Sequence, residues 1–153
     1  MNVAVLLFEE YETLDVFGPL EIFGRRTEDY KIKFYSLFGG NISNSHGVTI
    51  FTEKLELIKT GVDIFLIPGG YGTRKEVENT TLLDLIKEIA ELSNYVLTVC
   101  TGSSLLAKTG LLDFKNATTN KIAFDWVTTQ GENVNWKRKA RWVIDGEFHT
   151  SSG

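Results

Sequence analysis

The sequence contains little cysteine, histidine or proline: one Cys, two His and two Pro among 153 residues. A single cysteine excludes an internal disulfide, and this is typical of proteins from a reducing compartment. The formal net charge is −4, so the chain lacks the overall positive charge that favours nucleic acid or an anionic membrane surface. We therefore expect neither nucleic acid nor a membrane as a partner.

Long hydrophobic runs are also missing. The apolar run in the opening residues, MNVAVLLFEE, is too short to span a bilayer and lacks the basic leader and small-residue cleavage site of a signal peptide. We interpret it as the first strand of a domain and expect a cytoplasmic protein. The apolar content of 42% suits one domain with a sizeable core. No linker, repeat or low-complexity segment divides the chain, so residues 1–153 are predicted to form a single domain.

Strand patterns alternate with helical patterns along the chain. Apolar runs predict strands at residues 3–8, 31–38, 62–67 and 95–99, a β excursion at 42–52, and a hairpin within 141–150. Apolar residues at helical spacing predict helices within 14–25, at 82–92, after residue 103 and at 121–129. This alternation predicts an α/β fold with a mostly parallel sheet sandwiched by helices. Ligands of such sheets lie outside the carboxyl ends of the strands.

The stretch YVLTVCTGSSLLA at 95–107 organises this prediction. A buried strand ends at Cys100, a tight turn follows at Thr101 and Gly102, and a helical pattern then begins. Unpaired N–H groups and the positive dipole end of that helix favour a thiolate, so we expect a Cys100 pKa below the ordinary value of about 8.5. The arrangement resembles the nucleophile elbow of hydrolases, with cysteine in place of serine. The alternative is a small apolar residue that closes a core strand.

Several motifs in order resemble the ThiJ/PfpI superfamily, within the flavodoxin-like, class I glutamine-amidotransferase-like fold. They are LDVFGPLEIF at 14–23, IPGGYG at 67–72, VCTGSSLLAKTGLL at 99–112, ATTN at 117–120 and DGEFHTSSG at 145–153. The order and spacing are specific together, whereas each motif alone is weak. The combination of GPLE with VCTG looks most like the isonitrile hydratase branch and the similar ligand-binding domains of certain transcriptional regulators.

The resemblance implies four central site residues. Cys100 falls on the reactive cysteine of the family and Asp15 on the acid beside it. A carboxyl group close to a thiolate shares its proton, so the pair is expected to titrate as a unit. Gly70 and Thr101 fall where backbone N–H groups face the reacting atom and can hold developing negative charge. From the residues alone, the alternative for Asp15 is a helix N-cap.

Further residues are predicted to support the site. They are Glu21, Gly69, Tyr71, Gly102 and Asn120. Glu21 is the Glu of the GPxE pattern, with a solvated helix position as the alternative, and Tyr71 is expected to wall the pocket. Asn120 departs from the comparable branch, which often reads ATTHW where this chain reads ATTNK. We interpret His46 and His149 as surface or hydrogen-bonded residues, so no Cys-His protease triad is expected.

The resemblance implies a cysteine-dependent hydratase that converts an isonitrile to an N-substituted formamide through a thioimidate on Cys100. It implies a small-molecule substrate, a homodimer, and neither metal nor organic cofactor. It also implies further helix after the Thr-Ser-x-Gly pattern, so we expect the natural chain to continue beyond Gly153 or another subunit to cover this edge. The alternatives are a non-catalytic ligand-binding or sensor domain, glyoxalase- or deglycase-like chemistry, and a poorly defined protease or amidase.

Overall fold

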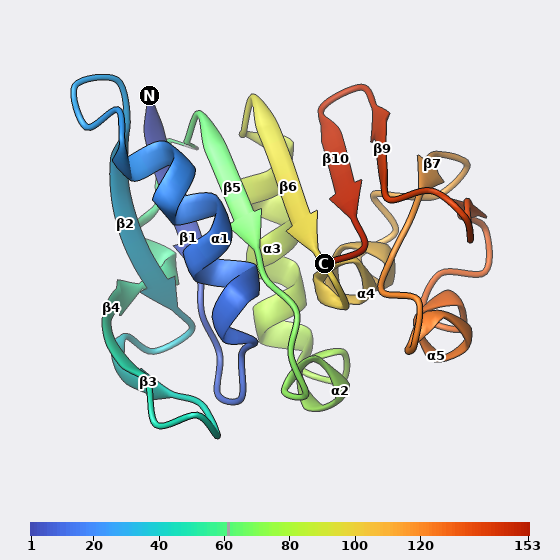
Figure 1. The fold of residues 1–153 in the computed structure, drawn as a ribbon, viewed down its shortest axis with the longest axis horizontal. Coiled ribbons are helices and arrows are strands. Elements are labelled where there is room, and N and C mark those ends of the chain that lie inside the picture. The colour runs from blue at the N-terminus through green and yellow to red at the C-terminus, as the bar shows by residue number, and fades with distance from the viewer. Residues whose placement is uncertain (61) are drawn as a thin grey trace.

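A sheet of eight strands in the order β3-β4-β2-β1-β5-β6-β10-β9 forms the centre of the fold (Figure 1). The computed structural model describes residues 1–60 and 62–153. The strands of this sheet are β1 Asn2–Leu6, β2 Lys31–Ser36, β3 Gly40–Ser43, β4 Thr49–Lys54, β5 Ile64–Ile67, β6 Tyr95–Val99, β9 Trp142–Asp145 and β10 Phe148–Ser151. A small second sheet pairs β7 Asn116–Ala117 with β8 Asn135–Trp136.

Helices lie on both faces of the sheet. They are α1 Thr13–Gly24, α2 Thr73–Glu76, α3 Thr80–Glu91, α4 Gly102–Lys108 and α5 Phe124–Thr128, with a 3₁₀ turn at Leu55–Leu57. In Figure 1, α1 crosses the front of the sheet, while α3 and α4 lie behind it. Strands covered on both faces must be apolar on both faces. All four residues of β5 and four of the five in β1 are accordingly buried.

The predicted α/β fold is confirmed. The strands from β4 through β2, β1, β5 and β6 to β10 are parallel, and the antiparallel pairs β3–β4 and β9–β10 lie at the two edges. The predicted turn between β9 and β10 uses Gly146, whose φ of 64° is easily adopted by glycine. All carboxyl ends of the parallel strands meet at one edge, so the loops after β1, β5 and β6 come together there.

The structure fixes the start of helix α1, which the sequence pattern places only somewhere within residues 14–25. It begins at Thr13 after the capping residue Glu12, whose side chain makes no cap hydrogen bond. Asp15 lies inside the first turn and is buried, so the N-cap interpretation of this residue is wrong. Pro19 sits within the helix. The first turn of α1 therefore delivers a carboxyl group to the interior beside the end of β6.

Two parts of the surface remain apolar. On the front face of β6, β10 and β9, no helix of the described residues lies over the sheet in Figure 1, and the exposed fractions of Trp142 and Ile144 are 69% and 61%. A hollow of about 590 Å³ on this face is lined by Pro19, Leu97 and Val99, among others.

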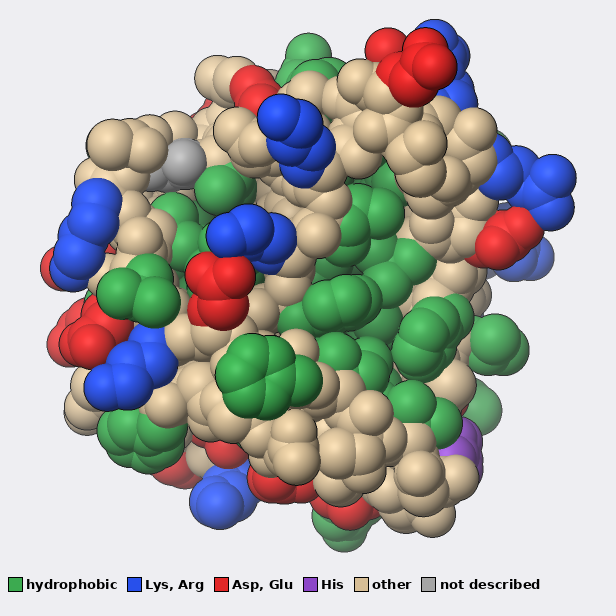
Figure 2. Space-filling model, turned by 90° about the vertical axis from the view of Figure 1, so that its left-hand side faces the viewer, with side chains coloured by type: hydrophobic (Ala, Val, Ile, Leu, Met, Phe, Trp, Pro, Cys, Tyr) green, Lys and Arg blue, Asp and Glu red, His purple; other side chains and the backbone are tan. Residues whose placement is uncertain are grey.

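Figure 2 looks onto the β2–β4 side, where hydrophobic side chains form a band bordered by charged groups. None of the described helices is long and apolar enough to cross a membrane.

Candidate active site

Cys100 stands at a sharp turn between β6 and α4. Its φ is 56°, in the left-handed region that costs a residue with a Cβ roughly 1–2 kcal/mol. Two neighbouring segments of the same chain hold this conformation. The Cys100 N–H donates to the Ser151 carbonyl at 3.1 Å, and the Thr119 hydroxyl donates to the Cys100 carbonyl at 2.9 Å. The predicted sequence of strand, cysteine, tight turn and helix is thus the geometry observed.

Asp15 and Cys100 lie together although they are 85 positions apart in the sequence. The Asp15 side chain is 5% exposed, and its Oδ2 accepts a hydrogen bond of 3.1 Å from the Gly69 N–H. The Asp15 carboxyl group lies close enough to the Cys100 thiol for each group to shift the pKa of the other. The loop after β5 and the first turn of α1 therefore fix an acid beside the sulfur.

The protonation of this pair differs from the sequence-based expectation. Burial and, to a smaller extent, the adjacent Asp15 charge together raise the pKa of Cys100 to about 11, although the Thr101 N–H acts to lower it. Burial likewise raises the pKa of Asp15 to about 6, against the lowering effect of the Gly69 N–H. The expected depressed thiol pKa is therefore wrong, because burial and a neighbouring carboxylate outweigh the donors of a helix start. At neutral pH the pair is a thiol that faces a carboxylate.

The Gly69–Gly70 loop packs so closely on the elbow that a side chain would collide with it. A Cβ at Gly69 would lie 2.6 Å from the Thr101 nitrogen and 2.8 Å from Asp15 Oδ2. Gly70 has a φ of 131°, and its N–H donates to Thr101 Oγ1 at 3.1 Å. The expectation that the Gly70 N–H faces the reacting atom is thus wrong in this structure, since a neighbouring hydroxyl occupies it. The Thr101 N–H acts to lower the pKa of the Cys100 thiol, and its role as a donor to the reacting atom stays a prediction.

Residues after β10 close the other side of the pair, and the sequence interpretation assigned them no role. A Cβ at Gly153 would lie 3.0 Å from Cys100 Cβ and 3.5 Å from Asp15 Oδ1. The Asn120 amide N–H donates to the Ser152 carbonyl at 3.5 Å, and its oxygen accepts from the N–H groups of Ile122 and Ala123, which precede α5. Asn120 therefore shapes the loop around the site. The Thr-Ser-x-Gly match was the signal that pointed to this segment.

Two predicted supporting residues lie outside the site. The Glu21 side chain is 68% exposed and pairs with Arg25 at 2.6 Å, so the solvated alternative is correct. The Tyr71 side chain is 74% exposed and covers no pocket wall around the sulfur; its ring lies 4.8 Å from the Arg74 guanidinium. Gly102 is buried at the start of α4, where an added Cβ would collide with the Ile67 carbonyl oxygen.

The histidines occupy other places, as expected. His46 Nδ1 lies 2.7 Å from the Thr13 hydroxyl, and His149 packs edge-on against Tyr95 at the start of β6, the opposite end from Cys100. Neither contacts the sulfur. Within residues 1–60 and 62–153, no three His, Cys, Asp or Glu side chains cluster closely enough to hold a metal ion.

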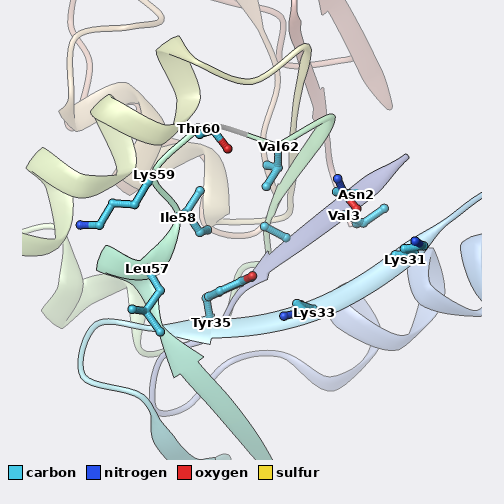
Figure 3. Close-up of a pocket in the computed structure, with 11 residues that line it drawn as sticks. Asn2, Val3, Lys31, Lys33, Tyr35, Leu57, Ile58, Lys59, Thr60 and Val62 are labelled. Carbon is cyan, nitrogen blue, oxygen red and sulfur yellow. The ribbon is translucent and has the colours of Figure 1, made fainter.

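The cavity in Figure 3 lies at the opposite edge of the sheet. It has a volume of about 280 Å³ and is lined by the first residues of β1, by β2 and by residues that precede β5. In Figure 3 the Lys59 ammonium points away from the other labelled side chains, and Lys33 is paired with Glu53 at 3.0 Å. Since ligands of parallel sheets bind at the carboxyl ends of the strands, this cavity is not the candidate active site.

Comparison with known proteins gives one consistent result. The sequence pattern of the DJ-1/PfpI family matches residues 1–153. Isonitrile hydratase from Pseudomonas putida is 29% identical over 153 residues, which cover all of this chain and 65% of that protein. A ThiJ/PfpI family protein from Pseudomonas syringae has a TM-score of 0.88 at 24% identity, over 99% of this chain and 62% of that one.

The same fold also occurs in regulatory proteins. An AraC family transcriptional regulator from Pseudomonas putida has a TM-score of 0.77 at 15% identity, over 99% of this chain and 81% of that one. The chain spans just under two thirds of the isonitrile hydratase and of the Pseudomonas syringae protein. The likeness to the solved structures establishes the fold.

Proposed function

This chain belongs to the DJ-1/PfpI family, as the motifs of its sequence indicated, and on that premise we propose that it is a cysteine-dependent hydratase of the isonitrile hydratase type. The observation that carries the proposal is the pairing of a buried acid, Asp15, with Cys100 at a strained turn. Strain and perturbed pKa values in buried acid–thiol pairs are features that cluster at functional sites.

The pair can perform the first half of the reaction without a cofactor. At neutral pH, Asp15 is ionised and Cys100 keeps its proton, so the sulfur becomes nucleophilic as the carboxylate removes that proton. The sulfur attacks the terminal carbon of the isonitrile, and Asp15 delivers the proton to this carbon. The product is a thioimidate, in which the carbon carries one hydrogen, the nitrogen and the sulfur. The Thr101 N–H stabilises the sulfur while it is anionic.

The second half returns the enzyme to its starting state. Asp15, again a carboxylate, takes a proton from a water molecule that attacks the thioimidate carbon, and the proton passes to the nitrogen. The tetrahedral carbon then collapses to the carbonyl of an N-substituted formamide as its C–S bond breaks, and the proton of its hydroxyl group passes to the released sulfur. The net change is addition of one water to one isonitrile.

Turnover of a panel of isonitriles to formamides tests this proposal. NMR detection of the formamide proton gives a direct readout for the wild type, Cys100→Ala and Asp15→Asn. The wild type is expected to turn over at least one isonitrile, Cys100→Ala none, and Asp15→Asn at a rate reduced by roughly 10²-fold or more. Turnover that survives in Cys100→Ala would exclude the proposed nucleophile.

A non-catalytic ligand-binding or sensor domain is the second candidate, and one observation favours it. A thiol with a pKa of about 11 is a poor nucleophile unless the carboxylate activates it during the reaction. Relatives of the same fold include proteins described as transcriptional regulators. Binding of a metabolite without consumption, combined with no turnover of isonitriles or of methylglyoxal, would favour this function. Consumption of methylglyoxal alone would favour glyoxalase-like chemistry, and the positions of both histidines give no support to a Cys-His protease.

The quaternary structure and location stay predictions. A homodimer, or further helical chain after Gly153, would cover the apolar face marked by Trp142 and Ile144. Light scattering of the purified chain measures the dimer directly: a mass of twice 17.2 kDa supports it, and a monomer contradicts it. A cytoplasmic location is consistent with the lone reduced cysteine and is tested by fractionation.

A further inference from the structure

Arg74 is an exposed cation held between two aromatic rings at the edge of the sheet where Cys100 stands. Its guanidinium carbon lies 4.8 Å from the centre of the Tyr71 ring and 4.7 Å from the centre of the Trp126 ring. Tyr71 belongs to the loop after β5, and Trp126 lies on α5. Figure 1 places α2 and α5 beyond the carboxyl end of β6, the edge at which Cys100 stands. The side chain of Arg74 thus lies between the loop after β5 and helix α5.

This guanidinium has no carboxylate partner among the described residues. None of the ion pairs that these residues form includes Arg74. Aromatic rings hold a guanidinium by its flat face. The N–H donors on its edge therefore remain for a ligand, and their fork matches the two oxygens of a carboxylate.

A short series of contacts connects Arg74 with the sulfur. The hydroxyl of its neighbour Thr73 lies 3.1 Å from Thr101 Oγ1, and the Gly70 N–H donates to the same oxygen at 3.1 Å. The Thr101 N–H acts to lower the pKa of the Cys100 thiol. The residue next to Arg74 therefore packs directly on the turn that carries Cys100, so an anion held by Arg74 would lie at the same edge of the sheet as the sulfur.

The two sides of the site carry opposite charge. On the side of α5, the Lys121 ammonium lies 3.2 Å from the Thr119 carbonyl. Burial lowers the pKa of Lys121, and the nearby charges of Arg138 and Arg141 lower it further. On the side of α1, the negative charge of Glu12 helps to raise the pKa of the buried Asp15. On the α5 side the acid Asp125 is paired with Arg138, so Arg74 and Lys121 are cations there without a carboxylate partner among the described residues.

We propose that Arg74 binds a carboxylate of the molecule on which Cys100 acts, so that the substrate is a small carboxylate-bearing compound. This proposal rests on the proposed function, because it assigns the charge of the substrate to the same site. Arg74 acts as a specificity residue: it holds the remote end of the substrate while the sulfur reacts with the other end.

Alkylation of Cys100 tests the proposal without any enzyme turnover. Iodoacetate and iodoacetamide react with a thiol in the same way and differ in charge, and Cys100 is the single cysteine of the chain. Rates are measured by intact mass at low ionic strength, where screening is weak. Arg74→Gln is expected to lower the iodoacetate rate roughly fivefold relative to the iodoacetamide rate. The ratio of the two rates cancels any change in the thiol pKa.

Lys75→Gln is the matched control. It removes the same charge from the next residue of α2, but Lys75 lines a different cavity with Phe8 and Leu82. Lys75→Gln should leave the ratio of the iodoacetate rate to the iodoacetamide rate at its wild-type value. Arg74→Lys should recover part of the ratio that Arg74→Gln loses. An equal ratio in the wild type and Arg74→Gln, or the same drop in Lys75→Gln, would overturn the proposal. A wild-type thiol that neither reagent reaches in the folded protein would also overturn it.

The result of this alkylation test does not depend on whether the chain turns over isonitriles. A chain that turns over no isonitrile can still show the charge preference, and the ligand of a sensor domain would then be the carboxylate. Conversely, turnover of neutral isonitriles with no preference for iodoacetate would uphold the hydratase and reject the role of Arg74. Circular dichroism of each variant establishes that the compared proteins are equally folded.

Discussion

The amide of Gly69 and the carboxylate of Asp15 form the contact that fixes the acid beside Cys100. The Gly69 N–H donates to Asp15 Oδ2 at 3.1 Å, and a Cβ on the same glycine would lie 2.8 Å from that oxygen. This position thus requires both a backbone donor and the absence of a side chain. The close approach links the loop after β5 to the first turn of α1.

Gly69→Ala is predicted to separate these elements. The added methyl group would also lie 2.6 Å from the Thr101 nitrogen, so backbone must shift, at a cost of about 1–3 kcal/mol. We expect a lower midpoint of urea unfolding and loss of any activity that depends on Asp15. The control is Gly24→Ala at the end of α1, where nothing outside the adjacent residues lies within 4 Å of the new Cβ and no loss of stability is expected. Equal stability of the two variants would contradict the account.

Cys100→Gly is predicted to be more stable than Cys100→Ala by about 1 kcal/mol, since the φ of 56° strains a residue with a Cβ. Both variants remove the sulfur, so the comparison isolates the backbone. Urea unfolding curves measure the difference. A more stable alanine variant would show that the turn is not strained in solution.

Asp15→Asn is predicted to lower the pKa of the Cys100 thiol. The carboxylate raises this pKa through its charge, and the amide carries no charge. The thiol still stays less acidic than a free cysteine, because burial persists. The pH dependence of iodoacetamide alkylation reports the pKa. Glu12→Gln is the control, since Glu12 acts on Asp15 and not on the sulfur; an equal shift in both variants would contradict the pairing.

The raised pKa of Asp15 predicts how stability depends on pH. Its pKa rises from 3.8 to about 6 on folding, so the folded state binds the proton more tightly than the unfolded state. The resulting stabilisation is complete below pH 4 and is lost as the pH rises through 6. Its size is on the order of 2–3 kcal/mol by linkage.

Urea unfolding of the wild type and Asp15→Asn between pH 4 and pH 7 isolates this contribution. The free energy of unfolding of the wild type should fall relative to that of the variant across the interval from the unfolded pKa of 3.8 to the folded value of about 6. Two parallel profiles would show that Asp15 titrates normally.

Much of the fold was predictable because it depends on local sequence patterns. Continuous apolar runs identify β1 and β5, whose residues are buried on both faces. The strand, Cys100 and the helical pattern after it are adjacent in sequence, so their geometry follows from local rules. Motif order indicated that Asp15 would lie near this sulfur.

The remaining features depend on tertiary packing. The helix start of α1 was predicted only loosely, and with a period of about 3.6 residues the observed start directs Asp15 inward and Glu21 to solvent. The thiol pKa was expected to fall, because the local rule counts helix donors and not burial. The N–H of Gly70 was expected to be free, but a hydroxyl from the elbow occupies it.

Intact mass of the protein quenched during reaction with an isonitrile tests the nucleophile most directly. The account predicts a wild-type species heavier by the mass of one isonitrile, located on Cys100 by peptide mapping and missing from Cys100→Ala. Formamide production by the wild type with no such species at any quench time, or an adduct of the same mass in Cys100→Ala, would contradict it.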